Sequence, residues 1–228
     1  MISFEAGPVD SLTHATSLLD GGATRVGVSI GPESSVETWA AMSTSRTRGR
    51  LGVMGRPSAE LVSLVNALSP RPAWLDLDMR GQDPTVIQTV IANCEVPVHL
   101  RCLPLDYDED PAWVRAAMSA LPIRRGDAYV VSLLHSLEKP LAWLEHESGT
   151  HPDDVTMRDV HGLASKQNVV LTAPWNSQDR VPWFVEQLPE HTRLFAYLRG
   201  ACVSRASYPM EISVTQALAV LKSLIAVR

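Results

Sequence analysis

Eight short apolar segments, separated by stretches of helical periodicity, constrain the fold of this chain more than any other feature. The expected strands cover residues 2–6, 25–30, 50–54, 73–79, 96–102, 128–134, 168–173 and 193–198. Strand and helix therefore alternate through all 228 residues, which is typical of a closed parallel barrel surrounded by helices. We predict an α/β fold with a single (βα)8 TIM-barrel domain over residues 1–228.

Nearly every expected strand carries a polar residue at the same parity. The other parity is apolar, as in Val26 and Val28 or Leu75 and Leu77, and should pack on the helices. Because side chains alternate with a period of two, the polar parity points into the barrel. It consists of Glu5, Ser29, Asp76, Asp78, His99, Arg101, Ser132, Thr172 and Tyr197, with Arg199 just beyond the last strand. Branched aliphatic side chains usually fill such an interior, so charges near the strand ends predict a ligand site there.

Composition and charge argue against several classes of function. The net charge is −5 and the basic residues are scattered, so we expect no nucleic-acid partner. The cysteines Cys94, Cys102 and Cys202 lack metal-type spacing and cannot all pair, which favours a reducing cytoplasm. No apolar run approaches the roughly 18 residues of a membrane span, and the N-terminus lacks the features of a signal peptide. We expect a soluble cytoplasmic protein with no membrane partner.

Two stretches resemble one enzyme family. Residues 19–34, LDGGATRVGVSIGPES, are similar to the beginning of the (5-formylfuran-3-yl)methyl phosphate synthases of methanofuran biosynthesis. That family has an acidic-Gly-Gly-Ala-Asp run before a strand ending Asp-Val-Lys-Asn/Asp-Pro. Residues 195–202, FAYLRGAC, resemble its Val-Arg-Gly-Ala-Ala/Leu-Cys after the eighth strand. The resemblance implies a barrel that condenses two glyceraldehyde 3-phosphate molecules through a Schiff-base lysine. It also implies a phosphate site at Arg199, Gly200 and Ala201.

The chain departs from this family at the positions that carry its chemistry. The family lysine at the end of the second strand falls on Ser29, and the lysine of the fourth strand falls near Asp76. An aspartate and a lysine around the sixth strand fall near Ser132 and Ser136. The phosphate turn after the seventh strand is replaced by residues 172–174, which end in a proline without a backbone donor.

The number and positions of the lysines also argue against a Schiff-base mechanism, independently of the comparison with the family. The chain has only Lys139, Lys166 and Lys222. Lys222 falls in the last expected helix, Lys166 falls at the opposite mouth of the barrel, and Lys139 precedes a proline at a helix start. A Schiff base needs a desolvated lysine in the site. We therefore interpret the chain as a diverged member that lacks the active-site lysines, with the family chemistry lost or replaced.

The polar interior suggests the replacement. Asp76 or Asp78 with His99 could transfer protons, and Glu5 could join them if the barrel register allows. The predicted anion-binding groups are Arg101, Arg199, Gly200, Ala201, Ser29 and Ser132. These residues predict a lyase or aldolase-like enzyme that needs no cofactor and acts on a small anionic, phosphorylated carbonyl compound.

The polar interior also fits a structural role. The same charges could form a structural ion network, Asp76 or Asp78 with Arg101 and Glu5 with Arg199. The chain would then be a non-catalytic paralogue that binds or assembles with a partner in one-carbon cofactor biosynthesis, or a homo-oligomer. A divalent metal on the Asp, His and Glu set is a weaker hypothesis, because no compact ligand motif is present.

The tryptophans help to distinguish an enzyme from a non-catalytic partner protein. Exposed indoles at Trp39, Trp113, Trp143 and Trp183 on the outer helices would favour a partner protein. Trp74 shares the parity of Asp76, so we expect it to fill the bottom of the barrel.

Overall fold

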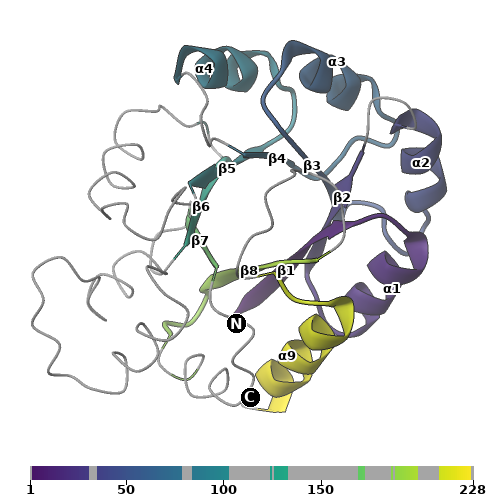
Figure 1. Cartoon of the computed structure of the whole chain (residues 1–228), viewed down its shortest axis with the longest axis vertical. Helices are drawn as coiled ribbons and strands as arrows, with labels where there is room; N and C mark the ends of the chain where they lie inside the picture. The colour runs from purple at the N-terminus through teal and green to yellow at the C-terminus, as the bar shows by residue number, and fades with distance from the viewer. Residues whose placement is uncertain are drawn as a thin grey trace, which may run out of the picture.

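The computed structural model is a closed barrel of eight parallel strands, β1 to β8 in chain order (Figure 1). It describes residues 2–30, 35–78, 84–102, 124, 126–132, 169–172, 186, 188–199 and 211–226. The strands are β1 (Ser3–Val9), β2 (Arg25–Ser29), β3 (Leu51–Gly55), β4 (Leu75–Asp78), β5 (Val98–Cys102), β6 (Ala128–Ser132), β7 (Val169–Thr172) and β8 (Arg193–Tyr197). The described helices are α1 (Leu12–Asp20), α2 (Ser35–Met42), α3 (Ala59–Ala67), α4 (Pro84–Asn93) and α9 (Val214–Ala226). The predicted barrel is confirmed.

Helix starts follow from local hydrogen bonding. The Ser11 side chain accepts from the amide of His14 at the start of α1, and Ser58 accepts from Leu61 at the start of α3. At the start of α9, the backbone amide of Gln216 donates to Ser213 Oγ, and the backbone amide of Ser213 donates to the side-chain oxygen Oε1 of Gln216. These side chains satisfy amides that have no partner within the helix.

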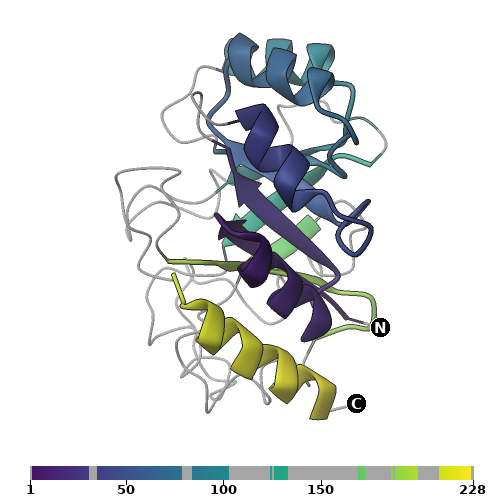
Figure 2. The same cartoon turned by 90° about the vertical axis from the view of Figure 1, so that its right-hand side faces the viewer.

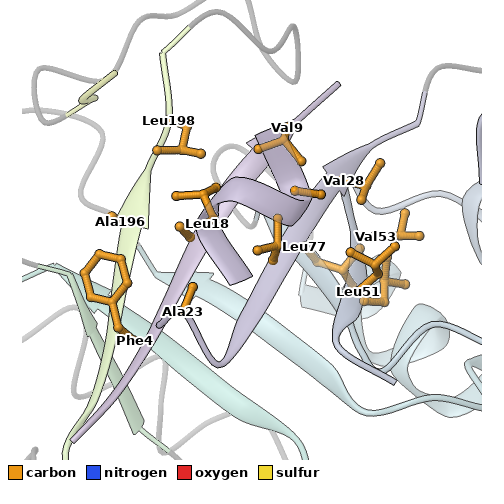
Figure 3. Packing of buried hydrophobic residues seen from close by; sticks show 14 of the residues in the cluster. Phe4, Val9, Leu18, Ala23, Val28, Leu51, Val53, Leu77, Ala196 and Leu198 are labelled. Carbon is orange, nitrogen blue, oxygen red and sulfur yellow. The ribbon is translucent and has the colours of Figure 1, made fainter. Parts of the chain in front are cut away.

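The larger core layer lies between the strands and the outer helices. Apolar side chains of the expected outward parity meet Leu18 of α1 in this layer (Figure 3). Beside α1 lies α9 (Figure 2), close enough that a β-carbon on Gly21 would come within 2.6 Å of Leu218. Trp39 of α2 is buried and donates to the carbonyl of Pro70, so it packs within the chain. Trp113, Trp143 and Trp183 lie outside the described residues.

Glycines on the first three strands make room for large side chains in the barrel interior. Gly7 and Gly27 leave room for Met54, whose Sδ atom would lie 2.3 Å from a β-carbon on Gly27. Gly52 likewise leaves room for Trp74, which is fully buried. Trp74 therefore fills the interior as expected. The buried charged residues of the interior come from β1, β4 and β5: Glu5, Asp76, Asp78, His99 and Arg101.

One strand boundary matters for the site. The first strand was expected to end at residue 6, but β1 continues to Val9 across a register irregularity between Ala6 and Val9. Glycine and proline, which occupy positions 7 and 8, are uncommon inside a strand, but an irregular pairing accommodates them here. Glu5 therefore lies in the first half of its strand and not near its carboxyl end.

Candidate active site in the barrel interior

Asp76 of β4 and Arg101 of β5 form a buried ion pair, which we call the upper pair. Arg101 Nε donates to Asp76 Oδ1 at 2.8 Å, and the terminal nitrogen Nη2 contacts the same oxygen. The side chains of both residues are at most 1% exposed. The second carboxylate oxygen, Asp76 Oδ2, is buried and has no hydrogen-bond partner within the described part of the chain.

This environment changes the proton affinity of both groups. Burial raises the pKa of Asp76 to about 6, against the opposing effect of Arg101 and with smaller contributions from Asp78 and Glu5. Burial alone would lower the pKa of Arg101, but Asp76, Tyr197 and Asp78 outweigh it and raise that pKa. Arg101 therefore stays charged, whereas Asp76 can bind and release a proton near neutral pH, as a general acid or base must.

An aromatic pair packs against the upper pair. The guanidinium carbon of Arg101 lies 4.9 Å from the centroid of the Tyr197 ring, a cation–π contact. Tyr197 in turn packs on Phe195, with ring centroids 4.8 Å apart. Thr172 Oγ1 is buried without a hydrogen-bond partner among the described residues. The interior thus holds a fixed cation, and two of its buried oxygens have no hydrogen-bond partner within the described part of the chain.

Glu5, His99 and Arg193 form a second group, which we call the lower cluster. Arg193 Nη2 donates to Glu5 Oε1 at 2.9 Å and lies 3.3 Å from His99 Nε2. His99 Nδ1 lies 3.8 Å from Glu5 Oε2. Arg193 is the first residue of β8, so this cluster lies toward the amino-terminal end of the barrel.

The lower cluster is packed against an indole. His99 stacks on Trp74 with ring centroids 5.5 Å apart, and Arg25 lies over the same indole at 5.6 Å. Burial lowers the pKa of His99 well below its ordinary value, and the charges of Arg193 and Arg25 lower it further. His99 is therefore a neutral imidazole at neutral pH.

The predicted site residues are only partly brought together. Glu5, Asp76, Asp78, His99 and Arg101 are all buried, and register places Asp76 beside His99 and Asp78 beside Arg101. The described contacts of the His99 ring, however, are with the lower cluster and Trp74. The strand stagger thus divides one expected set into two groups.

The expected pairing of Glu5 with Arg199 is wrong. Glu5 pairs with Arg193, while Arg199 is exposed and donates to the carbonyl of Glu211. Sequence reasoning missed Arg193, although it has the inward parity of Phe195 and Tyr197. That parity was the available signal.

The remaining anion-binding candidates gain little support. The amide of Arg199 already donates to Ile212, so it is not free for a phosphate. Ser29 ends β2 and is half-buried, and Ser132 ends β6. Gly200, Ala201, Lys139 and Lys166 lie outside the described residues. Lys222 is exposed on the outer helix α9.

The described residues show neither a metal cluster nor a membrane-spanning helix. Within the described ranges, no three His, Cys, Asp or Glu side chains are placed to hold a metal ion. No helix among the described elements is long and apolar enough to span a membrane.

Known proteins share the fold of this chain. No family model and no curated protein matches it. Among solved structures, phosphoribosylanthranilate isomerase from Thermotoga maritima aligns with a TM-score of 0.56 at 10% identity, covering 99% of this chain and 100% of the isomerase. The 3-hexulose-6-phosphate synthase from Salmonella typhimurium aligns at 0.52 with 15% identity, covering 100% of both chains. Dihydropteroate synthase from Yersinia pestis aligns at 0.56 with 12% identity, covering 99% of this chain and 92% of the synthase. At these identities the similarity shows the barrel fold alone.

Proposed function

We propose that this chain is an enzyme that acts by acid–base chemistry on a small anionic carbonyl compound carrying a phosphate. The observation that supports this most is the Asp76 carboxyl group. Arg101 holds Oδ1, while Oδ2 is buried without a partner in the described part of the chain. Its pKa of about 6 suits proton transfer near neutral pH.

In the proposed reaction, Asp76 Oδ2 removes the proton next to the substrate carbonyl. The C–H electron pair forms the enolate C=C bond, and the carbonyl electrons move to its oxygen. Arg101 stabilises the negative charge that develops on this oxygen. The enolate carbon then takes back the proton held by Asp76, or it attacks the carbonyl carbon of a second molecule. In the second case a C–C bond forms, the C=O π electrons of that molecule move to its oxygen, and this oxygen takes the proton from Asp76.

The resemblance to the (5-formylfuran-3-yl)methyl phosphate synthases supports the substrate class. Residues 19–34 and 195–202 carry it. Two of the fold neighbours, phosphoribosylanthranilate isomerase and 3-hexulose-6-phosphate synthase, are named for phosphorylated sugar compounds. A Schiff-base route is disfavoured, because Ser29 takes the place of the family lysine and Lys222 lies on the outer surface. A diverged member using Asp76 in place of lysine reconciles these observations.

Proton exchange in deuterium oxide tests the reaction directly. With glyceraldehyde 3-phosphate or dihydroxyacetone phosphate, we expect enzyme-dependent loss of the NMR signal of the proton next to the carbonyl. Asp76→Asn should slow this exchange by about 100-fold or more, whereas the surface variant Asp20→Asn should leave it unchanged. Mass spectrometry of the same mixtures detects the furan aldehyde phosphate if the family reaction also runs. No exchange with either compound by a folded protein would contradict the proposal.

The pairing of the charges supports a second candidate. Arg101 and Glu5 already have ionic partners inside the barrel, as expected for a non-catalytic paralogue in one-carbon cofactor biosynthesis. Such a protein would fold normally but neither exchange the substrate proton nor bind either carbonyl phosphate. Its partner, a homo-oligomeric state and a cytoplasmic location stay predictions.

A further inference from the structure

The lower cluster joins three strands at the end of the barrel opposite the predicted ligand site. Glu5 is on β1, His99 on β5 and Arg193 on β8. In (βα)8 barrels the amino-terminal end serves stability more than chemistry. The cluster is separate from the Asp76 chemistry proposed above, and nothing in that chemistry uses it.

The hydrogen bonds determine the protonation state of His99. Arginine is only a donor, so His99 Nε2 must accept the bond from Arg193 at 3.3 Å. A neutral imidazole then carries its proton on Nδ1. This proton faces Glu5 Oε2 across 3.8 Å, too far for a hydrogen bond. Both atoms are buried, and neither has a hydrogen-bond partner in the described ranges.

The charged groups around His99 come from several strands. Glu5 of β1 and Arg193 of β8 touch the ring, and Arg25 of β2 lies beyond the stacked Trp74 of β4. Asp76 is the register neighbour on β4, and the neighbour on β6 is the uncharged Ala128. The nearest carboxylate oxygen without a hydrogen-bond donor is therefore that of Glu5.

We propose that Glu5, His99 and Arg193 form a pH-responsive latch, in which a proton taken up by His99 replaces Arg193 with His99 as the main partner of Glu5. The proton binds the Nε2 lone pair, so Nε2 can no longer accept from Arg193. The imidazolium and the guanidinium then repel each other, while Nδ1–H closes the 3.8 Å gap to Glu5 Oε2. Arg193 can move because its side chain is 20% exposed.

Release of Arg193 loosens the amino-terminal end of the barrel. Arg193 is the Cα partner of Ser3, and the Ser3 amide donates to the carbonyl of Thr192 at 2.9 Å. When Arg193 leaves Glu5, a side-chain link between β1 and β8 at this end is lost. The Ser3 amide reports this change through its hydrogen exchange.

Heteronuclear NMR of the histidine ring nitrogens tests the latch in the full-length protein. At about pH 7.5 we expect His99 to be the Nδ1–H tautomer, and on acidification it should gain its proton well below the ordinary histidine value. Arg193→Gln should raise the midpoint of His99 by about one pH unit, and Glu5→Gln should lower it by a similar amount. The surface variant Arg46→Gln is the matched control and should leave the midpoint of His99 unchanged.

Hydrogen exchange of the Ser3 amide gives a second readout. In acid, protection of this amide should fall at least tenfold in the wild-type protein as His99 titrates, and should not change with pH in this way in Arg193→Gln. An Nε2–H tautomer at neutral pH, a midpoint of His99 that is not below the ordinary histidine value, or no response to Arg193→Gln would overturn the latch. These outcomes do not depend on whether Asp76 transfers a proton from a substrate.

Discussion

The upper pair and the lower cluster are both contacts between a carboxylate and an arginine, but they differ in access to water. The Arg101 side chain is 1% exposed, whereas that of Arg193 is 20% exposed. Both side chains of the upper pair are almost fully buried among the described residues, so the loss of one partner leaves the other poorly solvated. Arg193 of the lower cluster is partly exposed, and the cluster also contains a neutral histidine that can compete for the carboxylate. The same residue types therefore form two different contacts. Breaking the buried upper pair should cost much folding free energy, whereas in the lower cluster His99 can replace Arg193 as the partner of Glu5.

Arg101→Met should produce the largest effect. It leaves the Asp76 carboxylate buried without its counterion, so we expect the free energy of unfolding to fall by about 3–5 kcal/mol. Urea denaturation near pH 7 measures this loss. The double variant Asp76→Leu/Arg101→Met should recover most of it, because no uncompensated charge then remains. Equal losses in the single and double variants would show that the ion pair is not what stabilises this level.

Acid should favour the folded state through Asp76. Its pKa in the fold is about 6, above the ordinary 3.8, so its stabilising contribution is present below 3.8 and is lost as the pH rises through 6. The difference between the two pKa values corresponds to about 3 kcal/mol of folding free energy, at roughly 1.4 kcal/mol per pKa unit.

The difference in unfolding free energy between the wild-type protein and Asp76→Asn isolates this contribution. As the pH falls from about 7 to about 3.5, the unfolding free energy of the wild-type protein should rise by about 3 kcal/mol relative to that of Asp76→Asn. The opposing titration of His99 is common to both proteins and cancels. A difference that does not change with pH would contradict the raised pKa of Asp76.

Arg193→Met should cost less than Arg101→Met. It removes hydrogen bonds to the buried Glu5, which are worth about 1.5–3 kcal/mol for a charged acceptor, but water can reach this end of the barrel. Urea denaturation of the two variants under the same conditions compares the two levels directly. A loss as large as that of Arg101→Met would mean that both levels are equally closed to water.

Among the variants that break an ion pair, the surface variant Arg46→Gln should lose the least unfolding free energy. Arg46 pairs with Asp20, and their side chains are 66% and 57% exposed. We expect a loss of less than about 1 kcal/mol. Thermal unfolding at low and high salt measures it, and a larger loss would show that exposure does not govern the cost of breaking an ion pair in this chain.

Much of the architecture was predictable because its signals are local. Period-two alternation predicted eight strands and the inward face, and Asp76, Arg101 and Trp74 are buried in the interior as that pattern indicates. The limit of β1 was wrong, because residues 7 and 8 look like a strand end when read locally. The pairing of the lower cluster could not be predicted, since Glu5 and Arg193 are 188 positions apart in sequence.

The sequence by itself determined the barrel, the parity of each strand, and the absence of a suitable lysine at the positions where the resembling family has one. Only the tertiary structure decided that Glu5 meets Arg193 and His99 while Asp76 meets Arg101. The physical reason is that alternation is a property of each strand alone. The height at which a side chain lies depends on the stagger between strands, which accumulates around the closed sheet.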